Sequence, residues 1–398
     1  MKKIIKNLSN TVFALGVVSF FSDISSEMIY PILPIFLTSI LGASPLIIGL
    51  LEGIAESTSA IVKIFSGILS DHTLHRKPWV MAGYSLAGFV KPLIAFTSNW
   101  HEVLGVRFLD RAGKGMRSAP RDALIADVTD EQFRGKAFGF HRAMDHAGAV
   151  IGPLLAAGYL LLPGSTYRKL FLLAAIPAFL AALFLYFGVH EKDHPHHPHH
   201  TVKFEIRALF GEFQADFRWF LLAVFLFTLG NSSDVFLLIR LSQAGITARG
   251  IAVLWSVHHV IKMIANYYGG HFSDKAGFRK MIALGWIWYA VIYYGFSITH
   301  STQVLIGLFL LYGIYYGFVE PSEKAFIASL VPRSHRGRAY GLYHFVMGVG
   351  LFPASFMFGW VIQKYGVSVA FYMGAIFALL GCFTLWISFL NRIEDLKV

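Results

Sequence analysis

Charged side chains recur inside the long apolar stretches of this sequence. Asp23 and Glu27 are four residues apart, and Glu56 and Lys63 lie in the next stretch at the spacing of one helix face. An ion is costly inside a bilayer, so each such group is a candidate functional residue. Carboxyl and imidazole groups bind and release protons when their surroundings alternate between buried and hydrated. We therefore expect a proton-coupling site in a central cavity, formed by Asp23, Glu27, Glu56, Lys63, Arg107, His141 and Asp145.

The alternative for each of these residues is structural pairing, in which acids and bases neutralise one another and move nothing. Buried ion pairs are not a dependable gain in stability, so a water-filled cavity lined by titratable groups explains so many charges better. The second half of the sequence has fewer charges among more aromatic residues. We expect that half to shape the substrate side of the cavity, with Asp234, His259 and Lys262.

The composition favours lipid as the solvent for most of the chain. Of 398 residues, 56% are hydrophobic and only 14% are charged, whereas a soluble domain carries about 25% charged residues. The net charge of +11 comes largely from basic residues between apolar stretches, a distribution typical of membrane proteins that argues against a nucleic-acid partner. The single cysteine, Cys382, excludes an intramolecular disulfide and a cysteine metal cluster.

Twelve apolar stretches are long enough to cross a bilayer as helices, which takes about 20 residues each. Lys and Arg are concentrated in alternate connecting segments, which predicts that both termini are cytoplasmic. We expect an all-α integral membrane protein with two pseudo-symmetric six-helix bundles, 1–189 and 217–398, and a cytoplasmic histidine-rich linker, 190–216. The predicted spans are 11–39, 46–70, 78–98, 102–124, 136–162, 168–189, 217–242, 248–272, 279–299, 303–329, 337–362 and 368–390.

Two polar segments occur once in each half. The segments Gly67–Lys77 and Gly270–Lys280 have Gly, Ser, Asp, Arg and Lys at the same spacing. A second pair, Arg134–Gly139 and Arg336–Gly341, recurs in the same order. Because the copies occupy the same places in the helix count, they indicate one half-protein built twice.

Twelve helices in two halves, a long middle loop and a Gly-x-x-x-Asp-x-x-x-x-Arg-Lys loop in each half resemble the major facilitator superfamily of transporters. The resemblance implies that cytoplasmic charge networks at these loops hold one state of a rocking cycle. The residues that it assigns to this conformational latch are Gly67, Asp71, Arg76, Asp122, Asp274, Arg279, Glu323 and Lys324.

Gly148, Gly152 and Pro153 are similar to the Gly-x-x-x-Gly-Pro motif that this family associates with proton antiporters exporting drugs or metabolites. Small residues four apart also let two helices approach closely. Close packing alone therefore explains the two glycines without any direction of transport.

Histidines are concentrated at the start of the predicted linker. Neutral imidazole is the commonest metal ligand in proteins, and short histidine-rich tracts are typical of metal binding. The other explanation is a flexible linker whose composition has drifted. The candidate metal ligands are His194, His196, His197, His199 and His200.

These features predict a secondary active transporter that moves a small solute by alternating access, coupled to protons, in the bacterial inner membrane. Export of a drug, a metabolite or a siderophore-like chelate is favoured, and a transition-metal ion transporter is the alternative. A non-transporting receptor or scaffold of the same fold is the alternative from another class. The sequence has no phosphate-binding loop, zinc-protease motif or nucleophile elbow, so we expect no enzyme and no cofactor. We expect a monomer whose partners are membrane lipid, the solute and H+.

Overall fold

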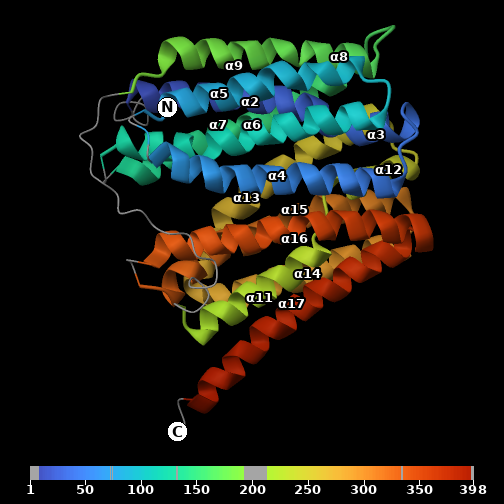
Figure 1. Cartoon of the computed structure of the whole chain (residues 1–398). Helices are drawn as coiled ribbons and strands as arrows, with labels where there is room; N and C mark the ends of the chain where they lie inside the picture. The colour runs from blue at the N-terminus through green and yellow to red at the C-terminus, as the bar shows by residue number, and fades with distance from the viewer. Residues whose placement is uncertain are drawn as a thin grey trace. The chain divides into compact units, whose positions relative to one another are not determined.

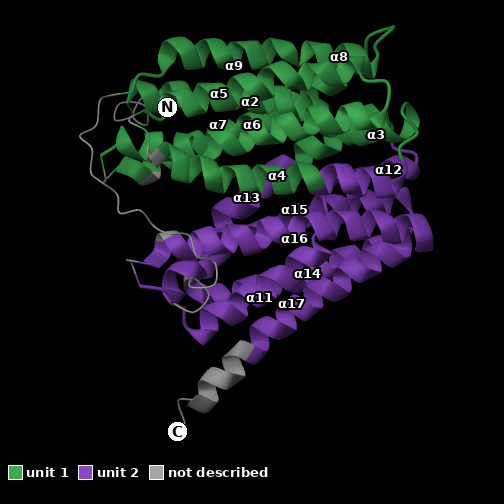
Figure 2. Ribbon diagram, viewed as in Figure 1, with its two compact units in different colours: residues 1–43, 54–200, 247–257 green, residues 44–53, 201–246, 258–398 purple. Residues whose placement is uncertain are grey.

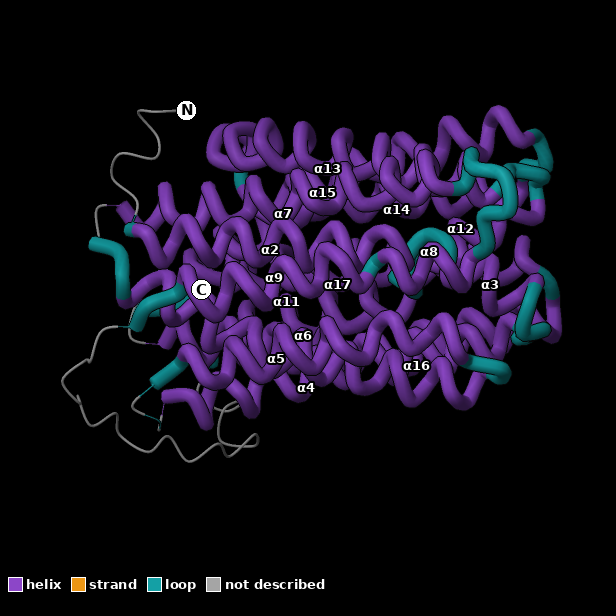
Figure 3. The backbone as a smooth tube through the Cα atoms, turned by 90° about the horizontal axis from the view of Figure 1, so that it is seen from above, coloured by secondary structure: helices purple, strands orange, loops and turns teal. Residues whose placement is uncertain are grey.

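The computed structural model describes residues 9–71, 73, 75–130, 133–191, 213–332 and 335–395. Throughout these residues the chain forms helices and short connections, and no strand occurs among them (Figure 3). The elements labelled in Figure 1 are α2 (Asn10–Ile29), α3 (Leu33–Ser39), α4 (Pro45–Asp71), α5 (Lys77–Val90), the 3-10 helix η1 (Lys91–Phe96), α6 (Trp100–Asp127), α7 (Arg134–Tyr159), α8 (Tyr167–Leu173), α9 (Ala175–Gly188), α11 (Ala215–Gly230), α12 (Val235–Gln243), α13 (Ala248–Ala276), α14 (Phe278–Ile298), α15 (Thr302–Leu330), α16 (Arg336–Tyr365) and α17 (Val367–Asp395).

Each of the twelve predicted spans coincides with one helix or with two helices in series. Within the described residues, nine of these helical stretches are long and apolar enough to cross a membrane. The other three are α6, α7 and α13, which are as long but carry more charged or polar side chains. Length and composition therefore separate nine apolar spans from three helices that need polar partners.

Prolines explain two of the interruptions within predicted spans. Pro31 and Pro34 lie where α2 ends and α3 begins, and Pro92 lies in the first turn of η1. Proline lacks an N–H donor and its ring clashes with the preceding turn, so a helix ends or changes pitch there. Pro153 and Pro353, by contrast, lie inside the continuous helices α7 and α16.

The sequence predicts one helix over 217–242, whereas the structure has two, because the chain leaves helical geometry at Asn231. Short polar side chains follow in Ser232, Ser233 and Asp234, and such side chains compete with the backbone for hydrogen bonds. Two backbone groups near the break have hydrogen-bond partners on other helices. The Tyr289 hydroxyl donates to the Gly230 carbonyl oxygen at 3.0 Å, and the Ser233 N–H donates to Ser355 Oγ at 3.3 Å.

The chain divides into two compact units, coloured separately in Figure 2. Unit 1 comprises residues 1–43, 54–200 and 247–257, and unit 2 comprises residues 44–53, 201–246 and 258–398. The boundaries fall within helices, since the first residues of α4 belong to unit 2 and those of α13 belong to unit 1.

In unit 1, α2 packs against α7 and α9, and α5 packs against α6 and α9. Its core is aliphatic and includes the fully buried Val12, Leu15 and Leu124. In unit 2, α14 packs against α15 and α17, and α11 packs against α16 and α17. The core of unit 2 is aromatic, with the Tyr289 and Tyr293 rings stacked 4.0 Å apart.

Candidate functional site

Helix α6 concentrates its charges on one face. Arg107, Arg111 and Lys114 recur four and three residues apart, with Asp110 and Arg117 beside them, and such spacing places side chains on one side of a helix. The opposite face carries Gly105, Leu109, Ala112 and Met116. A helix of this kind is stable in an apolar unit only if its polar face meets polar partners.

Those partners come from η1, α2 and α4. Lys91 of η1 donates to Ser26 Oγ at 2.7 Å, and its Nζ lies 3.8 Å from Asp110 Oδ1. Arg107 Nη1 lies 3.9 Å from the other oxygen of Asp110. Arg111 Nη2 pairs with Glu56 Oε1 of α4 at 3.0 Å. Ion pairs thus connect three neighbouring helices of unit 1.

Arg117 of α6 contacts α2 through a hydroxyl group rather than a carboxylate. Its Nη1 donates to Ser22 Oγ at 3.0 Å, and its guanidinium carbon lies 4.0 Å from the centre of the Tyr84 ring. A guanidinium stacked on an aromatic ring gains a cation–π interaction. Arg117 therefore remains buried next to the acids of α2.

Helices α2 and α7 of unit 1 approach each other closely at two glycines. A Cβ atom added at Gly148 would lie 2.5 Å from the Phe20 carbonyl oxygen and 2.9 Å from Asp23 Cβ. One added at Gly152 would lie 3.0 Å from Glu27 Cβ. The glycines of the predicted packing motif thus bring the α2 carboxylates against the backbone of α7.

Asp145 of α7 faces the same part of α2. Its Oδ1 accepts a hydrogen bond from Ser19, and its Oδ2 lies 3.5 Å from Nδ1 of the buried His141. Ser19 and Asp23 are four residues apart on α2, so Asp145 and Asp23 face each other and repel electrostatically. Two carboxylates, a hydroxyl and an imidazole therefore form one cluster, which we call the α2–α7 acid cluster: Ser19, Asp23, His141 and Asp145.

Glu27 lies one turn beyond Asp23 and has a different partner. Trp255, in the part of α13 that belongs to unit 1, donates its indole N–H to Glu27 Oε2 at 2.8 Å. The Tyr30 ring lies 5.2 Å from the Trp255 ring. Glu27 thus accepts a hydrogen bond from a neutral donor of α13.

The structure distributes the predicted first-half residues over four places, one of which is that of Glu27 beside Trp255. Asp23, His141 and Asp145 lie together, whereas Glu56 and Arg107 belong to the ion pairs of α6. The backbone of Lys63 packs against Gly115 of α6. A Cβ atom added at Gly115 would lie 3.0 Å from the backbone nitrogen of Lys63. Residues that the prediction omitted but the network contains are Ser19, Lys91, Asp110, Arg111, Lys114 and Arg117.

In unit 2, Asp234 accepts hydrogen bonds from two tyrosines. The Tyr312 hydroxyl lies 2.8 Å from Asp234 Oδ1, and the Tyr316 hydroxyl lies 3.1 Å from Oδ2. Lys262 Nζ lies 3.4 Å from the centre of the Tyr316 ring and 3.4 Å from Glu320 Oε1. The predicted Asp234 and Lys262 therefore meet at one tyrosine.

The third predicted residue of this half, His259, lies beside a buried histidine. The His258 and His259 ring centres are 6.0 Å apart. His258 Nδ1 lies 3.2 Å from the Phe309 carbonyl oxygen, and its ring stacks on Phe309 at 4.9 Å. His258 is therefore part of the aromatic core of unit 2.

The predicted latch residues have varied surroundings. The side chains of Asp71 and Asp274 lie outside the described part of the structure. Arg76 forms an ion pair with Asp127, and Asp122 pairs with its neighbour Arg121 at 2.9 Å.

In the second copy, Arg279 donates to the Leu385 carbonyl oxygen. Glu323 is buried and accepts from the Tyr343 hydroxyl at 2.5 Å. The Lys324 carbonyl oxygen accepts from the Tyr340 hydroxyl at 2.7 Å. Gly67, in the first copy, packs near Ala119, whose Cβ would lie 3.3 Å from a Cβ added at the glycine.

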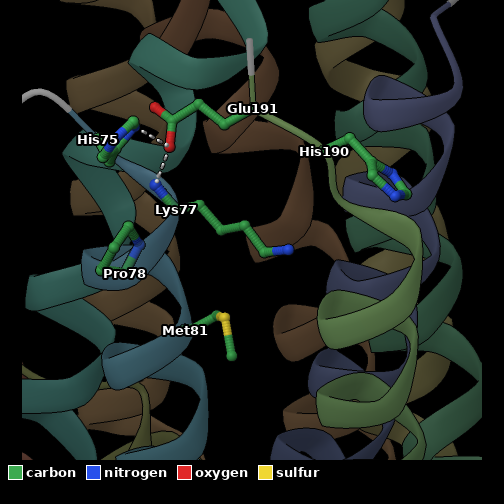
Figure 4. A pocket seen from close by; sticks show the side chains of 6 residues that line it. All are labelled: His75, Lys77, Pro78, Met81, His190 and Glu191. Carbon is green, nitrogen blue, oxygen red and sulfur yellow. Dashed lines mark hydrogen bonds and ion pairs between the residues drawn. The ribbon is translucent and has the colours of Figure 1, made fainter. Parts of the chain in front are cut away.

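A cavity of about 580 Å³ opens where α5 begins and the chain leaves α9 (Figure 4). Glu191 lies at its edge and accepts from the Arg76 N–H at 2.7 Å and from the Lys77 N–H at 2.9 Å. A carboxylate at this position satisfies unpaired donors and complements the positive end of the helix dipole. The residues that line the cavity are His75, Lys77, Pro78, Met81, His190 and Glu191.

We expect Glu191→Ala to destabilise unit 1 by about 0.5–2 kcal/mol, as for the loss of other helix N-caps. Glu191→Gln keeps one oxygen acceptor and should cost less. Thermal melting of the full chain in detergent measures both, with Asp130→Asn as a control that removes an exposed acid. Equal melting temperatures for Glu191→Ala and the control would show that this contact is dispensable.

The five histidines predicted as metal ligands, 194, 196, 197, 199 and 200, lie outside the described residues. Where the chain is described, no group of three or more His, Cys, Asp or Glu side chains is placed to hold a metal ion.

A model of the Major Facilitator Superfamily matches residues 15–257 and 241–397. The uncharacterized MFS-type transporter MJ1317 of Methanocaldococcus jannaschii is 34% identical over 381 residues, which is 94% of each chain. The multidrug resistance protein MdtH of Citrobacter koseri is 25% identical over 81% of this chain and 79% of its own. A crystal structure of a bacterial homolog of the human lysosomal transporter Spinster has a TM-score of 0.78 at 15% identity, covering 97% of both chains. Because the family model and the archaeal relative both match nearly the whole sequence, the chain belongs to the major facilitator superfamily of membrane transporters.

Proposed function

We propose that this protein is a proton-coupled secondary active transporter for a small solute, with twelve membrane spans. In this proposal α6, α7 and α13 join the nine apolar spans as inner helices. The arrangement of charges on α6 supports this proposal. Its apolar face is compatible with lipid, and its polar face has partners on η1, α2 and α4. Inward-facing ionisable groups of this kind mark ion and substrate pathways in membrane proteins.

The single observation that carries proton coupling is the α2–α7 acid cluster. Asp23 and Asp145 repel each other across two tightly packed helices, beside Ser19 and His141. Two carboxylates in one poorly hydrated site favour a state that shares a proton. If transport alternately hydrates and buries this cluster, the shared proton is loaded on one side of the membrane and released on the other.

Export across the inner membrane is the direction that we propose, with a drug, a metabolite or a siderophore-like chelate as cargo. The support is the relative named a multidrug resistance protein, which matches four fifths of the chain. The arrangement of basic loops further supports cytoplasmic termini.

The test is transport by the full chain in proteoliposomes under an imposed pH gradient. The cargo panel contains ethidium, an organic acid, a divalent metal ion and a ferric chelate, and a trapped pH dye records proton movement. We expect one organic cargo to move against its own gradient, opposite to the protons, and to stop when a protonophore collapses the gradient. Transport of the metal ion alone would favour the metal alternative, and no cargo-linked proton movement would favour a receptor.

A further inference from the structure

Lys114 is an exposed base on the charged face of α6. It lies near the middle of a 28-residue helix, inside the predicted span 102–124. Its side chain is exposed, whereas Arg107, Arg111 and Arg117 on the same face are buried. A lysine at such a depth is expensive unless it binds something.

The direction of the Lys114 side chain follows from its two neighbours. A Cβ added at Gly113 would lie 2.7 Å from the Gly83 carbonyl oxygen of α5, and one added at Gly115 would lie 2.7 Å from the Ser59 carbonyl oxygen of α4. Successive residues on a helix are about 100° apart. Lys114 therefore projects between these two contacts, from the charged face of α6.

The other bases of this face already have partners. Arg111 pairs with Glu56, and Arg117 binds Ser22 and stacks on Tyr84. In the part of the chain that the structure describes, the Lys114 ammonium has no hydrogen bond and no ion pair. Its electrostatic neighbours are, in decreasing order of influence, Arg111, Glu56, Asp23 and Arg117.

We propose that Lys114 binds an anionic oxygen group of the cargo, a carboxylate or a phosphate. This inference deepens the proposed function and rests on it. The ammonium offers three donors, and Arg111 and Arg117 on either side add positive potential. Glu56 is already paired with Arg111, and Asp23 acts on Lys114 only through space, without an ion pair, so the ammonium is available to a further anion. Arg107 and Lys63 are less suited, since Arg107 faces Asp110 and the backbone of Lys63 packs against α6.

The test is ligand-dependent thermal stabilisation of the full chain in detergent, where no gradient exists. The probes are a panel of aromatic and aliphatic carboxylates, the matching amides, and phosphate monoesters. We expect at least one anion to stabilise the wild type while its amide does not, and Lys114→Gln to weaken that binding about tenfold to hundredfold. Lys114→Arg keeps the charge and should restore most of the binding. Lys169→Gln removes an exposed lysine elsewhere and is the matched control.

Stabilisation by amides as strong as by carboxylates, or undiminished anion binding in Lys114→Gln, would overturn the proposal. Absence of stabilisation by every anion would contradict it as well. Because the assay has no pH gradient, these results are independent of proton coupling. A protein that binds anions in detergent but shows no cargo-linked proton movement in liposomes refutes the proposed function and leaves the anion site intact.

Discussion

Replacing Asp145 with asparagine is expected to uncouple transport from the proton gradient. Asparagine keeps the size of the side chain and one oxygen that can accept from Ser19, but it cannot take up a proton. Asp23 then faces a neutral group, and the repulsion that favours a shared proton disappears. Coupling between two sites commonly amounts to about 5- to 150-fold in affinity, so we expect proton-driven accumulation to fall by about tenfold or more.

The measurement compares gradient-driven accumulation with exchange of cargo at equal pH on both sides. Exchange needs no net proton movement, so Asp145→Asn should retain it while losing accumulation. Asp23→Asn should behave in the same way, whereas Asp130→Asn, which removes an exposed acid, should resemble the wild type. If Asp145→Asn accumulates cargo as the wild type does, the proton site is elsewhere.

Apolar length was sufficient to find the helices of this chain, but it could not place their interruptions. The predicted spans begin and end close to the observed helices, because about 20 apolar residues are needed to cross lipid. Pro31 and Pro92 mark two breaks by known backbone chemistry. The break at Asn231 also has a local signal in its run of short polar residues, which a search for apolar length ignores.

The membership of the α2–α7 acid cluster was partly predictable. Helical spacing pairs Ser19 with Asp23 and His141 with Asp145 on their own helices. The contact between those two pairs depends on how α2 and α7 rotate against each other, which spacing along one helix does not determine. The small size of Gly148 and Gly152 was the sequence signal of that contact.

The different surroundings of Lys63 and Lys114 could not be predicted from the sequence. Both are lysines in helical stretches with acids nearby in the sequence, but only Lys63 was predicted to line the cavity. What separates them is tertiary packing, since Gly115 brings the Lys63 backbone against α6 while Lys114 projects away from that contact. The hydrogen bond between Glu27 and Trp255 also depends on tertiary packing, because it joins residues from different halves of the sequence.

Gly148→Ala is expected to cost stability, although alanine is the better helix former. The added methyl group would meet the Phe20 carbonyl oxygen and Asp23 Cβ at distances that require α2 to move. Overpacking of this kind costs about 1–3 kcal/mol, which outweighs a helix-propensity gain of about 1 kcal/mol. Gly139→Ala, on the same helix with open space around its Cβ, should be neutral or stabilising.

The same change should also impair proton coupling, because moving α2 away from α7 separates Asp23 from Asp145. Melting in detergent and accumulation in liposomes together distinguish the two effects. Gly148→Ala should lower both, Asp145→Asn should lower accumulation with little change in melting, and Gly139→Ala should lower neither. A Gly148→Ala protein that melts and accumulates cargo like Gly139→Ala would show that the close approach of these helices has no part in the mechanism. A protein that is destabilised but fully coupled would instead show that the two carboxylates act independently.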